Sequence, residues 1–358
     1  MNAFETPAVV VDWPTAIRNI AAASQLCAAR GVALRPHVKT HKNGRLAREQ
    51  VRHGAVGVTV AKVAEAEYFV DEGMTDVFVA YPTIGSQKAR RLADLAHRAR
   101  LIAGVESLPG IAGLEAAAAR AGTTLDVRIE IETGLNRTGV APADAVTLAD
   151  AIGRSEHLHL EGVFTFRSTD FLSAAGRSAD ELGHEEGEMI VAAAELLRDR
   201  GHAVTSVSAG STPTYVSAAG VEGVTEVRPG TYVFHDAMTL DEGTCSVEDI
   251  ALRVIASVVS TPREGVAVVD AGSKTLGGDV GQTRLGSAGF GIVGDGLGTV
   301  VALNEEHGIV SLNPGCSVYV GDELTIVPMH VCTVVNLCDV VELGHGERLT
   351  IGARGLRT

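Results

Sequence analysis

The sequence has few aromatic residues, little positive charge and no long apolar run. Aromatic side chains make up 4% of its 358 residues, so alanine, valine, leucine and isoleucine must fill the core. No apolar stretch approaches the ~20 residues of a membrane-spanning helix. The 30 Lys and Arg residues are outnumbered by 44 Asp and Glu, which gives a net charge of −14. This balance argues against nucleic acid or an anionic membrane as the main partner.

Cysteines are also scarce. They are Cys27, Cys245, Cys316, Cys332 and Cys338. An odd and scattered set of this kind fits reduced thiols better than a disulfide framework. Residues 1–5 lack the basic and apolar regions of a signal peptide. We therefore expect a cytoplasmic protein, and its 46% hydrophobic content is enough to bury a sizeable core.

Residues 1 to about 235 alternate short β-rich runs with longer stretches rich in Ala, Leu, Glu and Arg. The candidate strands are residues 34–38, 57–61, 76–81, 101–106, 126–132, 158–166, 204–209 and 225–232. Helical patterns between them include residues 14–30, 61–72, 86–99, 108–121 and 185–201. Eight such repeats predict a parallel (β/α)8 TIM barrel. A doubly wound open sheet is the alternative, but no Gly-x-Gly-x-x-Gly follows the first strand.

The pattern changes near Cys245, where the helical period disappears. Short β-rich runs separated by Gly and Asp turns follow, at residues 250–260, 265–270, 298–303, 308–312, 323–327 and 332–341. These runs predict an all-β domain, either a small barrel or a sandwich. We therefore expect an α/β protein with the barrel in residues 1–240 and the all-β domain in residues 241–358.

Residues 34–42 are predicted to form a short strand that ends in a cluster of cations. Lys39 stands in this segment among Arg35, His37, His41 and Lys42. Each neighbouring positive charge disfavours the ammonium form, so we expect a lowered pKa for Lys39. A neutral lysine amine is what a Schiff base with a carbonyl cofactor requires. A basic rim that binds an anion is the alternative interpretation of the segment.

Three later strands end in polar or glycine-rich loops. The fifth is followed by Arg137, the seventh by residues 208–215 and the eighth by residues 228–232. In a parallel barrel these loops surround the active site, and those after strands seven and eight usually bind phosphate. Exposed backbone N–H groups and hydroxyls suit such a ligand. Together with Lys39, the loops predict a phosphorylated carbonyl cofactor, namely pyridoxal phosphate.

A candidate metal site lies in the second domain, at residues 327–332. If this stretch is a strand, His330 and Cys332 face the same side and can bind one ion. A thiolate with an imidazole favours zinc over magnesium or calcium. A buried thiol beside a hydrogen-bonded histidine is the alternative. Nearby, Glu305, Glu306 and His307 could supply a general acid or base, or form a solvated hairpin turn.

These motifs together resemble the fold-type III pyridoxal-phosphate enzymes, the alanine racemase-like class. Within it they resemble the D-serine dehydratase and D-threonine aldolase branch. The matching segments are residues 6–12, 35–42, 210–214, 270–274, 305–308 and 328–332. The lysine motif and the His-x-Cys motif are specific jointly, although neither is specific alone.

The resemblance implies roles for particular residues. Lys39 would bind the cofactor covalently and act as the catalytic residue, and Arg137 would lie near the cofactor's phenolic oxygen. The implied phosphate-binding positions are Gly210, Ser211, Thr212, Gly230 and Tyr232, and the implied metal ligands are His330 and Cys332. Members of the family are homodimers in which the C-terminal β domain meets the partner's barrel mouth, so we expect a homodimer.

The sequence departs from the family pattern on the sixth strand. Phe166 stands where relatives typically have a tyrosine, and Ser168 where they often have a glycine. We therefore assign no role to Phe166, because a hydrogen bond from this strand to the cofactor ring is in doubt.

The predicted reaction is the cleavage of a β-hydroxy D-amino acid by a lyase. Lys39 would take the Cα proton, and a metal at His330 and Cys332 would bind the β-hydroxyl oxygen as a Lewis acid. Related dehydratases tend to pair His with Cys, whereas related aldolases tend to carry His-x-Asp. We therefore favour a dehydratase of the D-serine or 3-hydroxy-D-aspartate type, with zinc as the metal and Mn²⁺ or Mg²⁺ as alternatives.

Several other functions remain open. A D-threonine aldolase would use the same residues, and an amino-acid racemase would need Lys39 and a second base but no metal. A non-catalytic pyridoxal-phosphate-binding regulator is disfavoured because such relatives lack the all-β domain. A metal-dependent barrel hydrolase is least favoured, because the candidate ligands lie outside the predicted barrel.

Overall fold

The computed structural model describes residues 4–167, 176–282, 288–344 and 346–358, and the chain forms two compact units. The barrel unit comprises Ala21–Lys39, Gly44–Gly230 and Leu356–Thr358. The β unit comprises Met1–Ile20, Thr40–Asn43 and Thr231–Gly355. Both units are therefore discontinuous in sequence, and the N-terminal residues belong to the β unit.

An eight-stranded parallel sheet forms the barrel unit. Its strands in spatial order are β2 (Ala33–Leu34), β9 (Glu226–Val227), β8 (Ser206–Ala209), β7 (Leu158–Phe164), β6 (Leu125–Glu130), β5 (Arg100–Val105), β4 (Asp76–Val79) and β3 (Val58–Val60). A parallel bridge between His37 and Thr59 joins the two edges of this sheet. The predicted α/β barrel is confirmed, and each predicted strand coincides with one of these eight.

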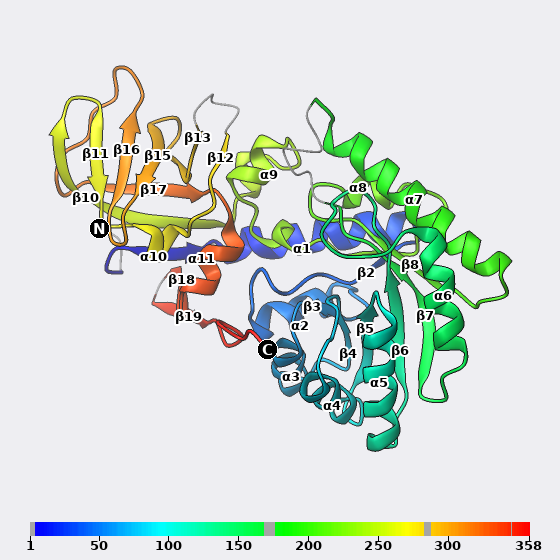
Figure 1. The fold of residues 1–358 in the computed structure, drawn as a ribbon. Coiled ribbons are helices and arrows are strands. Elements are labelled where there is room, and N and C mark those ends of the chain that lie inside the picture. Colours follow the sequence, from blue (N-terminus) through cyan, green and yellow to red (C-terminus); the bar gives the residue numbers. More distant parts are fainter. Residues whose placement is uncertain (1–3, 168–175, 283–287, 345) are drawn as a thin grey trace. The chain divides into compact units, whose positions relative to one another are not determined.

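Helices connect the barrel strands and lie on the outer side of the sheet (Figure 1). They are α2 (Gly44–Arg52), α3 (Val63–Asp71), α4 (Ser86–Leu95), α5 (Leu108–Ala121), α6 (Pro142–Gly153), α7 (Ala179–Asp199) and α8 (Tyr215–Ala218). Helix α1 (Trp13–Ala29) precedes β2. Sequence signals begin several of them: Ser107 caps α5 through Gly110 N–H, and Ser178 with Glu181 forms a capping box at α7.

The inside of the barrel combines an aromatic cluster with buried arginines. Phe78, Ile102 and Phe164 are at most 1% exposed, and the two phenylalanine rings meet edge to face with centroids 5.0 Å apart. The guanidinium carbon of Arg128 lies 4.7 Å from the centroid of the Phe78 ring. Branched aliphatic side chains dominate the interior of a typical TIM barrel, so these buried arginines need compensating charges.

Six charged side chains form a closed ring of ion pairs that runs from the buried Arg35, Arg128 and Glu226 to Arg100, which is 42% exposed. Arg35 pairs with Asp76 at 2.5 Å and with Glu226 at 2.7 Å. Arg128 pairs with Glu226 at 2.5 Å and with Glu161 at 2.8 Å. Arg100 closes the ring by pairing with Glu161 at 2.5 Å and with Asp76 at 2.9 Å. Alternating charges thus connect β4, β5, β6, β7 and β9 with the chain that follows β2.

A nine-stranded sheet forms the β unit. Its order is β11 (Val266–Val269), β16 (Gly308–Leu312), β15 (Gly298–Leu303), β14 (Gly291–Val293), β17 (Glu323–Pro328), β10 (Leu252–Arg263), β1 (Ala8–Val11), β18 (Val340–Gly344) and β19 (Glu347–Thr350). Strand β10 also pairs with β11, so the strands from β11 to β10 close into a small antiparallel barrel. The predicted all-β domain is confirmed.

Short elements complete the β unit. They are β12 (Gly281–Gln282), β13 (Ala288–Gly289), η1 (Thr231–Val233), α9 (Ala237–Asp241), η2 (Val247–Asp249), α10 (Ser273–Leu276) and α11 (Val331–Leu337). The predicted strand at residues 332–341 is wrong in its first half, because α11 occupies residues 331–337 and only β18 is extended. In the described part of the chain, no helix combines the length and apolar character that crossing a membrane requires.

We predict that Glu226→Gln lowers the free energy of unfolding by about 3–5 kcal/mol at neutral pH, because it leaves Arg35 and Arg128 buried with reduced compensation. Burial alone would raise the pKa of Glu226, but Arg128 and Arg35 lower it below its ordinary value. The carboxylate therefore contributes stability that is present above the ordinary pKa of 4.5 and is lost as the pH falls below it. Urea unfolding of the wild type and Glu226→Gln at several pH values measures the free energy of unfolding and its dependence on pH.

The matched control is Asp71→Asn, which removes an exposed carboxylate that pairs with Arg98 at 2.7 Å. We expect this surface change to cost about 0.5 kcal/mol or less. The ring would not stabilise the fold if Glu226→Gln and Asp71→Asn had equal effects, or if the effect of Glu226→Gln did not shrink in acid.

Candidate active site

Lys39 lies just beyond the C-terminal end of the first barrel strand. Strand β2 ends at Leu34, His37 forms the bridge that closes the sheet, and the backbone N–H of Lys39 donates to His37 Nδ1 at 3.4 Å. The Nζ atom of Lys39 lies 5.4 Å from the centroid of the Phe166 ring. The side chain is half-buried, as an amine that must react with a bound molecule requires.

The predicted crowding of Lys39 by cations is wrong for Arg35. Its guanidinium belongs to the ring of ion pairs inside the barrel, where it is 3% exposed. Carboxylates therefore neutralise this charge, and it does not contribute to a cationic rim. The predicted lowering of the pKa of Lys39 stays a prediction.

Arg137 also lies beside Phe166. Its guanidinium carbon is 4.9 Å from the centroid of the ring, and the arginine is exposed on the loop that follows β6. The ring of Phe166 thus faces both predicted cofactor-binding cations, Lys39 and Arg137, at cation–π distances. Ser168, the second departure from the family pattern, lies outside the described residues.

The predicted phosphate-binding positions of the barrel unit lie together on two loops. Gly210, Ser211 and Thr212 follow β8, and Gly230 follows β9. The N–H of Gly230 donates to Thr212 Oγ1 at 3.0 Å, which joins the two loops. Ser211 and Thr212 are 7% and 4% exposed. Tyr232, the fifth predicted position, is 1% exposed in η1 of the β unit.

A buried carboxylate that the sequence did not reveal lies against the first of these loops. Glu186 of α7 accepts hydrogen bonds from Gly210 N–H at 3.1 Å and from Thr214 Oγ1 at 2.7 Å. Glu186 stands in a helical Glu-Glu-Gly stretch, a sequence typical of an exposed helix surface. No pattern in the neighbouring residues therefore indicated that Glu186 is buried against a loop. The structure adds Glu186 to the candidate site.

The candidate metal ligands lie at the start of α11, not on a strand. Strand β17 ends at Pro328, His330 is the N-cap residue of α11, and Cys332 lies in its first turn. Pro328 terminates the strand because it cannot continue donating to the ladder. The two side chains nevertheless lie within hydrogen-bonding contact. The Sγ atom of Cys332 also lies 3.2 Å from Thr40 Oγ1, and Thr40 follows Lys39 directly in the chain.

Asp236 orients His330 and was missed in the sequence. Its Oδ2 atom lies 3.1 Å from His330 Nδ1 and accepts Val331 N–H at 3.1 Å, while its Oδ1 caps α9 through Thr239 N–H. The charge of Cys332 raises the pKa of His330; burial opposes this, and the hydrogen bond to Asp236 adds to it. A carboxylate on Nδ1 leaves Nε2 as the ring nitrogen that can bind a metal.

The chemistry of these donors fits a divalent metal such as zinc. An imidazole and a thiol in contact are zinc ligands, and a carboxylate on the far side of the imidazole is the usual supporting group. In the described residues, no group of three or more His, Cys, Asp or Glu side chains could enclose an ion. Two protein ligands alone, His330 and Cys332, would leave the other coordination positions of a metal to water or substrate.

The acidic stretch at residues 304–308 is the turn between β15 and β16, which matches the hairpin interpretation. Ser273 N–H donates to Asn304 O at 2.8 Å, so the turn contacts the start of α10. Lys274 and Glu306 form an exposed ion pair at 2.6 Å.

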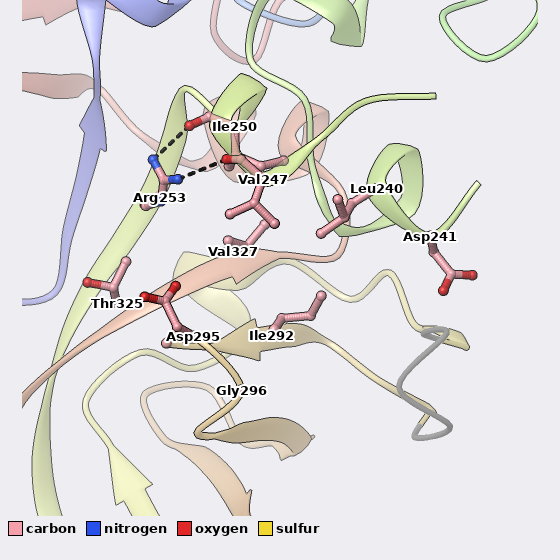
Figure 2. A pocket seen from close by; sticks show the side chains of 11 residues that line it. Leu240, Asp241, Val247, Ile250, Arg253, Ile292, Asp295, Gly296, Thr325 and Val327 are labelled. Atoms are coloured by element: carbon pink, nitrogen blue, oxygen red, sulfur yellow. Dashed lines mark hydrogen bonds between the residues drawn. The ribbon is translucent and has the colours of Figure 1, made fainter. Parts of the chain in front are cut away.

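A cavity of about 740 Å³ lies elsewhere in the β unit (Figure 2). Leu240, Val247, Ile250, Ile292 and Val327 are among the residues that line it. The guanidinium of Arg253 donates to the carbonyl oxygens of Ile250 at 2.7 Å and Val247 at 3.3 Å, as Figure 2 shows. None of the predicted site residues lines this cavity.

Comparison with known proteins identifies the class that this fold and these residues define. Residues 11–237 match the family model of the alanine racemase N-terminal domain, and residues 251–343 match that of a putative serine dehydratase domain. The chain belongs to the alanine racemase-like family of fold-type III pyridoxal-phosphate enzymes. The predicted family is confirmed.

Within this family, the chain is similar to individual enzymes along most of its length. The chain is 37% identical to D-threo-3-hydroxyaspartate dehydratase of Delftia sp. (strain HT23), over 92% of this chain and 91% of the relative. It is 31% identical to D-threonine aldolase of Arthrobacter sp., over 98% and 93%. A mutant of D-threo-3-hydroxyaspartate dehydratase in a metal-free form has a similar structure, with a TM-score of 0.87 and 33% identity over 97% of each chain.

We predict that Asp236→Asn weakens metal binding by about 10- to 100-fold, because the amide no longer fixes the imidazole of His330 as a carboxylate does. Asparagine preserves the helix cap of α9, so the fold should be retained. Competition with a chromophoric chelator measures the affinity.

Asp249→Asn is the matched control, since the Asp249 carboxylate accepts hydrogen bonds from the N–H and hydroxyl of Ser246 at the start of η2. It should leave the metal affinity unchanged. Equal metal affinity in wild type and Asp236→Asn would refute the supporting role of Asp236.

Proposed function

We propose that this protein is a pyridoxal-phosphate- and metal-dependent lyase that dehydrates a β-hydroxy D-amino acid of the D-serine or 3-hydroxy-D-aspartate type. The observation that carries the proposal is the placement of His330 and Cys332 together at the start of α11, with Asp236 on Nδ1 of His330. The end-to-end similarity to D-threo-3-hydroxyaspartate dehydratase supports the same reaction. The small-molecule partner is thus an amino acid with a hydroxyl group on Cβ.

The residues present fit pyridoxal phosphate. Lys39 offers an amine beside the barrel mouth and Arg137 a cation near it, and the hydroxyls of Ser211 and Thr212, on the loops of Gly210 and Gly230, suit a phosphate. Tyr232 is the further phosphate position that we propose from the family pattern. His330 and Cys332 would hold the metal, for which we propose zinc, with Mn²⁺ or Mg²⁺ as alternatives.

When bound, pyridoxal phosphate supplies an electron sink and the divalent ion a Lewis acid. Lys39 would hold the cofactor and would accept the proton from Cα of the substrate. Arg137 would hold the phenolic oxygen of the cofactor, and Asp236 would keep the imidazole of His330 aligned. Loss of the β-hydroxyl as water, followed by hydrolysis, yields a keto acid and ammonia.

Aldol cleavage to glycine and an aldehyde is the second candidate, and the similarity to D-threonine aldolase favours it. The thiol at residue 332 favours elimination, because the family pattern associates His-x-Cys with dehydratases. Racemisation would use Lys39 without the metal, and the match to the alanine racemase N-terminal domain keeps it as a further alternative.

A homodimer is the proposed assembly. Tyr81, Ile84 and Leu108 are 43%, 53% and 48% exposed on the segments that follow β4 and β5 in the barrel unit. Tyr319 and Val320 are 72% and 64% exposed in the β unit. A second copy of the chain that covered these apolar side chains would remove them from water.

We also propose a cytoplasmic location. No disulfide bond joins the five cysteines, all of which the structure describes.

We predict that protein loaded with cofactor and zinc releases ammonia from 3-hydroxy-D-aspartate or D-serine, with little glycine. Separate assays of ammonia and of glycine measure this, with D-threonine as a further substrate. Lys39→Ala should abolish activity, and a chelator should abolish elimination and aldol cleavage but leave racemisation. Glycine as the main product would replace the dehydratase by the aldolase, and full turnover by Lys39→Ala would refute the mechanism.

We predict that Cys332→Asp weakens zinc binding and slows elimination, because a hard carboxylate oxygen replaces a soft thiolate. Zinc affinity and initial rates of ammonia release measure the two effects. Cys338→Ser is the control, since Cys338 lies at the other end of α11 and its thiol donates to Val334 O. Unchanged zinc affinity in Cys332→Asp would show that Cys332 is not a ligand.

A further inference from the structure

Helix α7 carries a carboxylate in the interior of the barrel unit. Glu186 is 0% exposed, although α7 runs along the outer side of the sheet. We propose that Glu186 is a positioning residue that sets the shape of the phosphate-binding loop after β8, an inference that rests on the proposed cofactor. Glu186 does not itself contact the ligand; it acts through the loop.

Three donors use both oxygens of this carboxylate. Gly210 N–H and Arg167 N–H donate to Oε1 at 3.1 and 3.2 Å, and Thr214 Oγ1 donates to Oε2 at 2.7 Å. Arg167 follows β7 and Gly210 follows β8, so one side chain ties the ends of two adjacent strands together. Hydrogen bonds to a buried carboxylate are strong, and an unsatisfied buried acceptor is costly.

Thr214 passes this constraint on to Ser211. The Thr214 hydroxyl donates its hydrogen bond to Glu186 and at the same time accepts Ser211 N–H at 2.9 Å. The hydroxyl oxygens of Thr214 and Ser211 lie 3.0 Å apart. Tyr215 N–H donates to Ser211 O at 2.8 Å, which closes the turn. The position of the Ser211 hydroxyl, a predicted phosphate donor, therefore depends on the hydrogen bond between Thr214 and Glu186.

The helix is built to approach this loop closely. A Cβ atom at Gly183 would lie 2.5 Å from Thr214 O, and one at Gly187 would lie 2.6 Å from Val221 Cγ2. These glycines flank Glu186 on the same face of α7, one turn apart. Two side-chain-free positions on either side of a buried carboxylate allow the helix backbone to pack directly on residues 214–221.

The positions of the charges explain why an acid can lie beneath an anion site. The backbone N–H groups of Gly210 and Arg167 donate to Glu186, and such donors stabilise a negative charge on the carboxylate. Burial raises the pKa of Glu186, and Arg228 opposes this rise. The Arg228 guanidinium donates to Ser208 Oγ at 2.6 Å near the end of β8, so a cation accompanies the acid.

The test compares two ligands of the apo-protein, pyridoxal phosphate and pyridoxal, which lacks the phosphate. Titration of the bound ligand's visible absorbance gives both dissociation constants. For Glu186→Gln we expect that of pyridoxal phosphate to rise about 10- to 100-fold, because glutamine can accept at only one of the two oxygen positions. The dissociation constant of pyridoxal should change by less than about twofold, since pyridoxal makes no phosphate contacts.

Thr214→Val is the second variant, because it removes the relaying hydroxyl and keeps the shape of the side chain. It should show the same selective loss even if Glu186→Gln folds poorly. Glu65→Gln is the matched control: it makes the same chemical change at another buried carboxylate of the barrel unit, one that accepts Ala61 N–H, and it should leave the ratio of the two constants unchanged.

Wild-type affinity for pyridoxal phosphate in both Glu186→Gln and Thr214→Val would overturn the inference. An equal loss for both ligands would also overturn it, because a general structural role does not distinguish the phosphate. If the wild-type protein binds neither ligand, the proposed cofactor itself is wrong and the inference fails with it. Binding by the wild type and unchanged selectivity in the variants would reject the role of Glu186 alone.

Discussion

The closed ring of ion pairs, buried at Arg35, Arg128 and Glu226 and open to solvent at Arg100, is the constraint on which the barrel unit depends. Six side chains of alternating charge connect five strands with the chain after β2, and Glu226 and Arg128 at its centre are 5% and 2% exposed. Such pairs stabilise a fold only when every member is compensated, because a single unpaired charge in the interior costs several kcal/mol. This requirement constrains how the strands that carry the six side chains lie relative to one another.

The ion-pair ring and the predicted cofactor site are separated along the barrel strands. Asp76, Arg100 and Glu226 are the first residues of β4, β5 and β9, whereas Lys39, Arg137 and the Gly210 loop follow the ends of strands. This division is usual for parallel barrels, where the C-terminal ends carry the site. In this chain the loop after β8 has a support of its own, because Glu186 connects it to the end of β7 through hydrogen bonds that the ring does not share.

The β unit follows the same principle with a different carboxylate. His330 and Cys332 are two residues apart in sequence, so their pairing was foreseeable, but their location at a helix start was not. Pro328 ends the strand, and the first turn of α11 brings the imidazole and thiol together. Asp236, 94 residues earlier in the chain, then fixes the ring of His330. Glu186 thus supports the predicted phosphate loop and Asp236 the predicted metal ligand His330, and neither carboxylate is itself a predicted ligand.

The sequence by itself determined what depends on neighbouring residues. Alternating β-rich and helical runs predicted the eight barrel strands, the loss of that period predicted the all-β domain, and short motifs identified Lys39, Gly210 to Thr212 and His330 with Cys332. Only the tertiary structure decided which residues support them. Arg35 neighbours Lys39 in sequence yet pairs with Glu226, 191 residues away, and Glu186 reaches the loop from the middle of a helix. Contacts of this kind follow from packing between distant elements, and no local spacing encodes them.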